Sequence, residues 1–200
     1  MEDFLRRARL NELCQSCQTL GTICTQNGKD PETFGWQDAY SMAVALAYSQ
    51  DRITQDDVKE LHRRLFWLQT TPPPGVYRTE QVWLRDKLYC FPAPDEIADR
   101  MISWGEEVNA IPLSPAGAAE AHQSFVSIHP FFNGNGRVAR LIMNTLLLRG
   151  GYHALFVTAA WKQEYNAALQ SVQLGRDSRA FIDLIEKQVD KNEILFRNGR

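Results

Sequence analysis

The chain has 200 residues, of which 44% are hydrophobic and 23% are charged, and its formal net charge is −2 at pH 7. This length and composition are typical of one soluble globular domain with a core of its own. The acidic balance disfavours a broad nucleic-acid-binding or membrane-binding surface, and no apolar run is long enough to span a bilayer. The charged segment from Met1 to Arg9 lacks the apolar core of a signal peptide, so we expect a cytoplasmic protein.

The first part of the chain predicts helices. Residues 1–53 are expected to form an N-terminal helical region packed on a core over 54–197, with helices near 1–20 and 36–48. Thr54 starts the next helix, and Leu61, Leu65 and Leu68 supply its apolar stripe.

A short hairpin is expected next. Residues 76–91 are rich in Val, Tyr, Trp and Leu, and prolines lie on both sides of them. We refer to residues 76–91 as the flap. The remaining helices are expected at 96–108, from Ser114-Pro115 to Ile128, and at 137–149, 159–173 and 178–195. The predicted fold class is therefore all-α, with one small hairpin.

The segment 129–140, His-Pro-Phe-Phe-Asn-Gly-Asn-Gly-Arg-Val-Ala-Arg, carries the chemistry. Gly134 and Gly136 allow backbone conformations that expose N–H groups, and the helix that follows adds positive potential at its N-terminus. Arg137 and Arg140 share one helix face, which suits a chain of phosphates. An imidazole at His129 can accept a proton from an attacking hydroxyl. A glycine-rich link between two buried helices would need no ligand, but this combination indicates a nucleotide site facing a base.

This segment resembles the signature of the Fic family, His-Pro-Phe-x-(Asp/Glu)-Gly-Asn-Gly-Arg-x-x-Arg, at every fixed position except one. The resemblance extends over about 54–195 and includes Gly75-Val76-Tyr77-Arg78 at the start of the flap. It implies a helical fold with the motif loop at its centre. It also implies a protein adenylyltransferase, which transfers AMP from ATP to a Tyr, Thr or Ser hydroxyl of a target protein.

The resemblance assigns roles to individual residues. His129 would deprotonate the target hydroxyl, Arg137 would hold the β-phosphate region and Arg140 the γ-phosphate, and Phe131 would anchor the loop in the core. The target would dock on the flap near Arg78. The other residues implied are Gly134, Asn135 and Gly136 at the phosphates, Tyr165, Leu169 and Gln173 around adenine, and Thr79 and Val82 on the flap.

The departure from the signature is Asn133, where relatives usually carry the Asp or Glu that binds Mg²⁺. A neutral carbonyl oxygen predicts weaker metal binding, with Mg²⁺ held chiefly by the nucleotide. One alternative is therefore a catalytically weakened Fic domain that binds nucleotide or protein only. Transfer of UMP or phosphocholine is another, whereas a kinase-like variant would carry lysine in place of Gly136.

Many Fic proteins carry an inhibitory helix of the form (Ser/Thr)-x-x-x-Glu-(Gly/Asn). The stretch Ser103 to Glu107 has the spacing, but Val108 follows it, so the chain is expected to lack a brake of its own. Either a separate small antitoxin-like protein supplies the glutamate, or the enzyme is constitutively active. The chain could also be a fragment of a longer protein.

Overall fold

The computed structural model describes residues 31–84, 89–177 and 179–198. Its helices are α3 (Pro31–Ser49), α4 (Gln55–Leu65), the short 3₁₀ helix η3 (Pro94–Glu96), α5 (Ile97–Ala110), α6 (Pro115–Ile128), α7 (Asn135–Arg149), α8 (Lys162–Gln173) and α9 (Ala180–Asn198). Within these ranges, isolated β-type pairing is confined to one antiparallel bridge between Trp83 and Cys90. The predicted all-α fold is confirmed.

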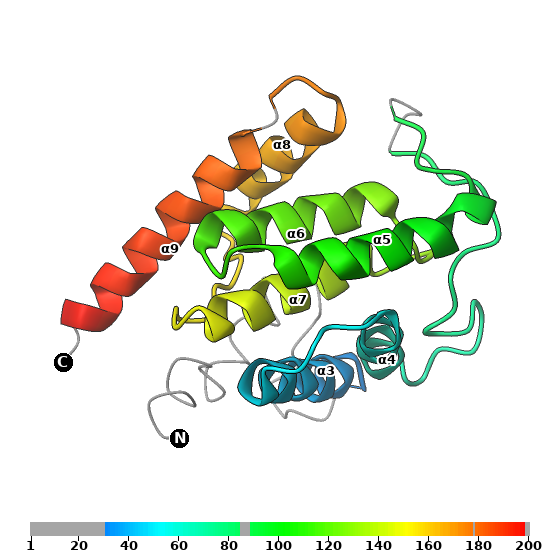
Figure 1. Cartoon of the computed structure of the whole chain (residues 1–200), viewed down its shortest axis with the longest axis horizontal. Coiled ribbons are helices and arrows are strands. Elements are labelled where there is room, and N and C mark those ends of the chain that lie inside the picture. The colour runs from blue at the N-terminus through cyan, green and yellow to red at the C-terminus, as the bar shows by residue number, and fades with distance from the viewer. Residues whose placement is uncertain (1–30, 85–88, 178, 199–200) are drawn as a thin grey trace.

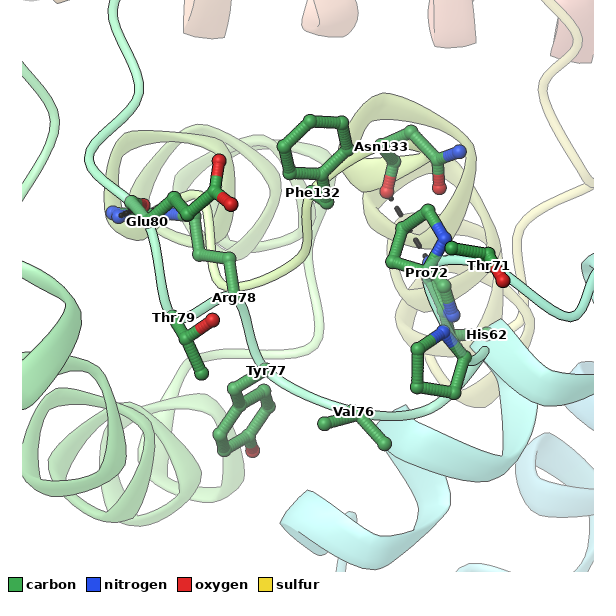
Figure 2. Close-up of a pocket in the computed structure, with 11 residues that line it drawn as sticks. His62, Thr71, Pro72, Val76, Tyr77, Arg78, Thr79, Glu80, Phe132 and Asn133 are labelled. Atoms are coloured by element: carbon green, nitrogen blue, oxygen red, sulfur yellow. Dashed lines mark hydrogen bonds between the residues drawn. The ribbon is translucent and has the colours of Figure 1, made fainter.

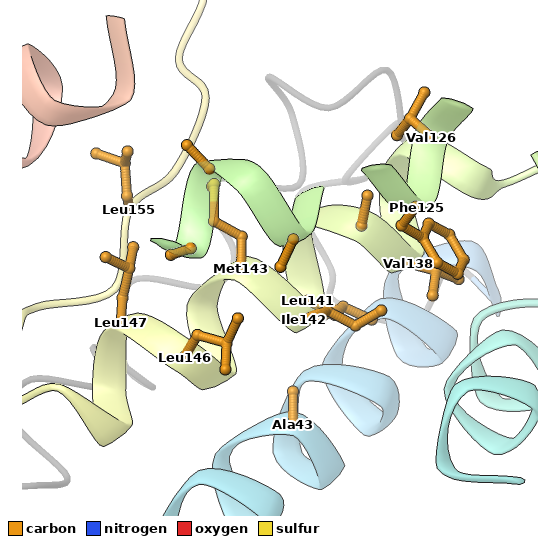
Figure 3. Packing of buried hydrophobic residues seen from close by; sticks show 14 of the residues in the cluster. Ala43, Phe125, Val126, Val138, Leu141, Ile142, Met143, Leu146, Leu147 and Leu155 are labelled. Carbon is orange, nitrogen blue, oxygen red and sulfur yellow. The ribbon is translucent and has the colours of Figure 1, made fainter. Parts of the chain in front are cut away.

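Helix α7 forms the centre of the domain. It lies between α6 on one side and α3 and α4 on the other (Figure 1). All its residues from Leu141 to Leu148 are buried, as expected of a helix that is apolar on every face. Figure 3 shows Leu146 and Ile142 directed toward Ala43 of α3. This packing fixes the first turn of α7, where the motif loop joins it.

Helix α4 begins where its sequence predicts and ends before the predicted residue Leu68. Thr54 and Asp57 form a capping box: the Thr54 hydroxyl accepts the Asp57 N–H at 3.2 Å, and Asp57 Oδ2 accepts the Thr54 N–H at 2.8 Å. The helix ends at Leu65, so the prediction that Leu68 continues the apolar stripe was wrong, and Leu68 is 56% exposed. The buried residues of α4 include His62 beside Leu61 and Leu65.

Helix α6 follows its predicted bounds. Ser114 caps it by accepting the Gly117 N–H at 3.1 Å, and Pro115 occupies the first turn, where its missing N–H costs nothing. The helix ends at Ile128, so His129 is its C-terminal cap. The motif loop therefore connects the C-terminal end of α6 to the N-terminal end of α7.

Other boundaries differ from prediction. Helix α3 already begins at Pro31, and α7 begins at Asn135 rather than at Arg137. Among its described residues, the flap pairs at one bridge, with two further backbone hydrogen bonds from the Leu84 N–H to the Tyr89 carbonyl and from the Phe91 N–H to the Val82 carbonyl. The predicted helix over 1–20 and the centre of the hairpin, 85–88, lie outside the described residues. No described helix has the length and hydropathy needed to cross a membrane.

Candidate active site

His129 lies at the junction of α6 and the motif loop. Its backbone is left-handed, with φ 53°, and its ring stacks on Phe91 with the centroids 4.0 Å apart. Nδ1 lies 3.3 Å from the carbonyl oxygen of Val126, which can only accept, so Nδ1 carries the proton and Nε2 keeps its lone pair. The imidazole is therefore held in the tautomer that a base at Nε2 requires.

The charge state of His129 follows from its surroundings. Burial lowers the pKa of His129 to about 4, the hydrogen bond to Val126 opposes this shift, and the positive charge of Arg78 adds to it. The ring is therefore neutral near pH 7, as proton acceptance demands.

The motif loop is closed by Asn135. Its Oδ1 accepts the Phe131 N–H at 2.9 Å, and its Nδ2 donates to the Phe131 carbonyl at 2.8 Å. Both polar atoms of the Asn135 amide therefore bond to the loop backbone, and the predicted role of Asn135 at the phosphates stays a prediction. Phe131 is fully buried, as the family signature implies.

Gly134 is required by space as well as by conformation. It has φ 72°, and a Cβ at this position would lie 2.3 Å from Cε2 of Phe66. Gly136 lies inside α7 and has no such contact. The loop therefore passes directly over the C-terminal end of α4, and only Gly134 uses the conformational freedom that the sequence suggested for both glycines.

The two motif arginines take different positions. The Arg137 guanidinium lies over the Phe66 ring, 4.3 Å from its centroid. Arg140 donates from Nη1 to the Tyr165 hydroxyl at 3.3 Å, and its Nε is buried without a hydrogen-bond partner among the described residues. Both belong to the first two turns of α7, close to its positive end.

Tyr165 is buried and links Arg140 to a second histidine. Its hydroxyl lies 2.8 Å from Nε2 of His122, a fully buried residue of α6 whose ring stacks on Phe181. Burial lowers the pKa of His122 well below its usual value, and the positive charge of Arg140 is a second cause. His122 is therefore neutral, and its Nε2 can accept a hydrogen bond from the Tyr165 hydroxyl. Tyr165 therefore orients Arg140.

The other two residues assigned to adenine also lie on α8. Leu169 packs against the hydrophobic core, and Gln173 is 8% exposed. Their role at adenine remains a prediction.

Asn133 presents one free oxygen. Its Nδ2 donates to Oε1 of Gln69 at 3.3 Å, whereas its Oδ1 is buried and has no partner among the described residues. A buried carbonyl oxygen without a donor is costly unless a ligand or water supplies one.

His62 of α4 is a site residue that the sequence reading missed. Nε2 lies 3.2 Å from the Asn133 carbonyl oxygen, and Nδ1 accepts the Gly75 N–H at 2.8 Å. Burial lowers the pKa of His62 to about 4, and hydrogen bonding to Asn133 opposes that shift. The available signal was spacing: His62 lies four residues after the buried Val58, on the inner face of α4.

The flap is attached to the motif loop by Arg78, which is 4% exposed. Its backbone N–H donates to the Pro130 carbonyl at 2.9 Å, and its guanidinium donates to the carbonyls of His129 at 2.8 Å, Glu80 at 2.8 Å and Pro92 at 2.6 Å. The Arg78 side chain is therefore used within the protein, and target docking at Arg78, Thr79 and Val82 stays a prediction.

A pocket of about 390 Å³ lies between the flap, the motif loop and the proline-rich segment after α4. Figure 2 shows Phe132 and Asn133 opposite Val76 and Tyr77 across it, with the hydrogen bond from His62 to Asn133 at one side. Thr79 and Glu80 form the remaining side. The flap and the motif loop thus share a concave surface.

Comparison with known proteins agrees with this arrangement. Residues 52–147 match the Fic/DOC family. A protein adenylyltransferase Fic of Drosophila virilis is 33% identical over 192 residues, which are 92% of this chain and 39% of that relative. The chain thus spans about two-fifths of the length of this relative.

Solved structures share the fold. A Fic domain containing signaling protein from Bacteroides thetaiotaomicron has a TM-score of 0.76 at 20% identity, covering 94% of this chain and 87% of that one. IbpAFic2 in complex with adenylylated Cdc42 has a TM-score of 0.69 at 19% identity, covering 93% of this chain and 63% of that one.

Proposed function

Because the chain belongs to the Fic/DOC family, we propose that it transfers AMP from ATP to a Tyr, Thr or Ser hydroxyl of a target protein. The observation that carries this proposal is the single loop that joins a neutral His129, with Nε2 available, to the positive N-terminus of α7. Relatives named as protein adenylyltransferases support the choice of AMP as the transferred group.

The reaction proceeds as an in-line displacement at the α-phosphorus. The hydroxyl oxygen of the target attacks as its proton passes to Nε2 of His129. A new P–O bond forms to the target, and the P–O bond to the β-phosphate breaks, so pyrophosphate leaves. General base catalysis of this kind contributes about 10²- to 10⁴-fold to the rate.

The start of α7 holds the phosphates in this proposal. The N–H groups of Arg137 and Val138 already bond to the Gly134 carbonyl, at 2.9 and 3.0 Å. The N–H groups of Asn135 and Gly136 precede them and have no backbone partner in the described part of the chain. These two donors and the helix dipole suit the oxygens of the α- and β-phosphates.

The arginines complete the phosphate site. Arg137 is assigned to the β-phosphate region, and Arg140, which Tyr165 orients, is assigned to the γ-phosphate. Tyr165, Leu169 and Gln173 remain the proposed surroundings of adenine.

Mg²⁺ is a proposed cofactor, and Asn133 Oδ1 fits one ligand position because it is a buried oxygen without a donor. The described residues hold no cluster of three or more His, Cys, Asp or Glu side chains that could bind a metal. When bound, Mg²⁺ would neutralise phosphate charge. Phosphate oxygens and water would supply its other ligands.

The target protein is proposed to dock on the flap. An extended segment of the target would pair with backbone near Thr79 and Val82, which places its hydroxyl beside His129. IbpAFic2 was solved with adenylylated Cdc42, which supports a protein as the acceptor.

Control by a separate inhibitor is proposed as well. Ser103 and Glu107, which have the inhibitory spacing but precede Val108, lie on α5 and line a groove that Cys90 and Phe91 of the flap also line. Arg140 is not among the residues of that groove. In this proposal, a separate antitoxin-like protein brings the inhibitory glutamate to Arg140.

The test uses ATP labelled on the α- or the γ-phosphate, added to cell lysate with the protein or with His129→Ala. Label from the α position on a protein band, absent with His129→Ala, is the expected result. Label from the γ position alone would indicate kinase-like chemistry. Nucleotide binding without any protein labelling would identify the alternative, a Fic domain that only binds.

A further inference from the structure

His62 uses both ring nitrogens to join two parts of the site that are far apart in sequence. Nδ1 lies 2.8 Å from the backbone nitrogen of Gly75, at the entrance to the flap. Nε2 lies 3.2 Å from the carbonyl oxygen of Asn133, in the motif loop. The side chain itself belongs to α4, so one residue bridges three segments.

The two bonds determine the tautomer. A backbone N–H can only donate and a carbonyl can only accept, so Nδ1 carries the lone pair and Nε2 carries the proton. Rings on both sides fix the imidazole: Phe131 stacks with its centroid 4.0 Å away, and Phe66 lies 4.7 Å away. With 3% of its surface exposed, His62 has little freedom to exchange either partner for water.

Both partners occupy positions where a small displacement matters. Gly75 has φ 78°, and a Cβ there would lie 2.7 Å from Cγ of Arg63 and 2.9 Å from the Lys59 carbonyl oxygen, so it is pressed against α4. Asn133 carries the proposed metal oxygen and precedes Gly134, at the start of the phosphate-binding turn. Movement of either backbone would shift one substrate relative to the other.

We propose that His62 is a positioning residue that aligns the two substrates: Nδ1 holds the flap, and with it the protein target, while Nε2 holds the motif loop, and with it the nucleotide phosphates. This inference rests on the proposed function only for the identity of the substrates. If His62 only filled space between Phe66 and Phe131, loss of the hydrogen bond at Nδ1 and loss of the one at Nε2 would not have different effects on the two substrates.

Two substitutions separate the halves of this role. His62→Asn can present Oδ1 to the Gly75 N–H but cannot reach Asn133. His62→Gln can present Nε2–H to the Asn133 carbonyl but loses the acceptor for Gly75. Loss of one hydrogen bond of about 1 kcal/mol changes an equilibrium constant by about fivefold.

The expected results are opposite for the two variants. His62→Gln raises KM for the target protein about fivefold and leaves the Kd for ATP unchanged. His62→Asn raises the Kd for ATP about fivefold and leaves the target KM unchanged. Equal effects of both variants on both constants, or no effect of either, would overturn the proposal. His153→Gln is the matched control, because His153 pairs with Glu193 and stacks on Phe196, outside the site.

A second measurement needs neither substrate nor activity. Long-range ¹H–¹⁵N spectra of the free protein report which nitrogen of His62 is protonated, and amide exchange reports the Gly75 N–H. We expect the Nε2–H tautomer and a protected Gly75 amide, with protection lost in His62→Gln and kept in His62→Asn. A proton on Nδ1, or equal exchange in both variants, would refute the alignment even if AMP transfer is observed. The expected spectra would support it even if AMP transfer fails.

Discussion

Asn135 makes two side-chain hydrogen bonds to the backbone of Phe131: its Oδ1 accepts the N–H at 2.9 Å, and its Nδ2 donates to the carbonyl at 2.8 Å. Asn135→Ala would leave a buried N–H and a buried carbonyl without partners. We expect a loss of about 3 kcal/mol in the free energy of unfolding, together with weakened ATP binding. Urea denaturation and calorimetry measure the two effects.

Asn144→Ala is the control, because Asn144 makes the same pair of bonds to the Leu155 backbone, at 2.8 and 3.2 Å, and is equally buried. It should lose similar stability and keep its ATP affinity. Equal ATP affinities in the two variants would mean that the loop does not depend on Asn135.

Arg78→Lys should release the flap. An ammonium group cannot reach the carbonyls of His129, Glu80 and Pro92 together, as the guanidinium does. We expect a loss of about 3 kcal/mol in stability and faster hydrogen exchange over the flap. In Arg100→Lys, which alters an exposed pair with Glu96, stability should change by less than about 0.5 kcal/mol. Unchanged exchange over the flap in Arg78→Lys would contradict the attachment.

Tyr165→Phe distinguishes two roles for Tyr165. It keeps the ring, which could contact adenine, and removes the hydroxyl that binds Arg140 and His122. If the hydroxyl positions Arg140 at the γ-phosphate, ATP affinity falls about fivefold while ADP affinity is retained. Equal losses for ATP and ADP, measured by calorimetry, would argue against this role.

Asn133→Asp should tighten Mg²⁺ binding and so lower the Mg²⁺ concentration that turnover requires. A carboxylate in place of the unpartnered Oδ1 adds a charged ligand for Mg²⁺. Turnover should rise at limiting Mg²⁺ and converge with the unmodified protein at saturating Mg²⁺. A titration of initial rate against Mg²⁺ concentration tests this, and equal rates throughout would show that charge at this position is not limiting.

The pKa of His129 predicts a titration well below neutrality. Because burial lowers it to about 4, the ring should remain neutral as the pH falls from 8 to 5 and gain its proton near pH 4. In the unfolded chain the ring takes up a proton near pH 6.5. The contribution of His129 to stability is therefore complete above pH 6.5 and is lost as the pH falls toward 4.

Histidine ring signals of the free protein, assigned by comparison with His129→Ala, give the midpoint directly. A midpoint near 6.5 would mean that water solvates the ring, which is inconsistent with its stacking on Phe91.

The features that the sequence predicted well are local ones. Ser114 and Pro115 define a helix start by themselves, and the apolar run in α7 predicts burial without knowledge of its neighbours. His62 could not be assigned in this way, because its role depends on the meeting of Gly75 and Asn133 in space. Family motifs likewise name Asn135 but do not tell which way its amide points.

The close approach of Gly134 to Phe66 has a consequence for rate. The motif loop is braced by α4, by Asn135 and by Arg78 through contacts made entirely within the protein. If the chain binds ATP as proposed, the N–H donors of the loop are already oriented before binding, so little conformational entropy is lost and little reorganisation accompanies charge movement. In the proposed reaction, helix α4 would therefore act as a rigid support of the loop.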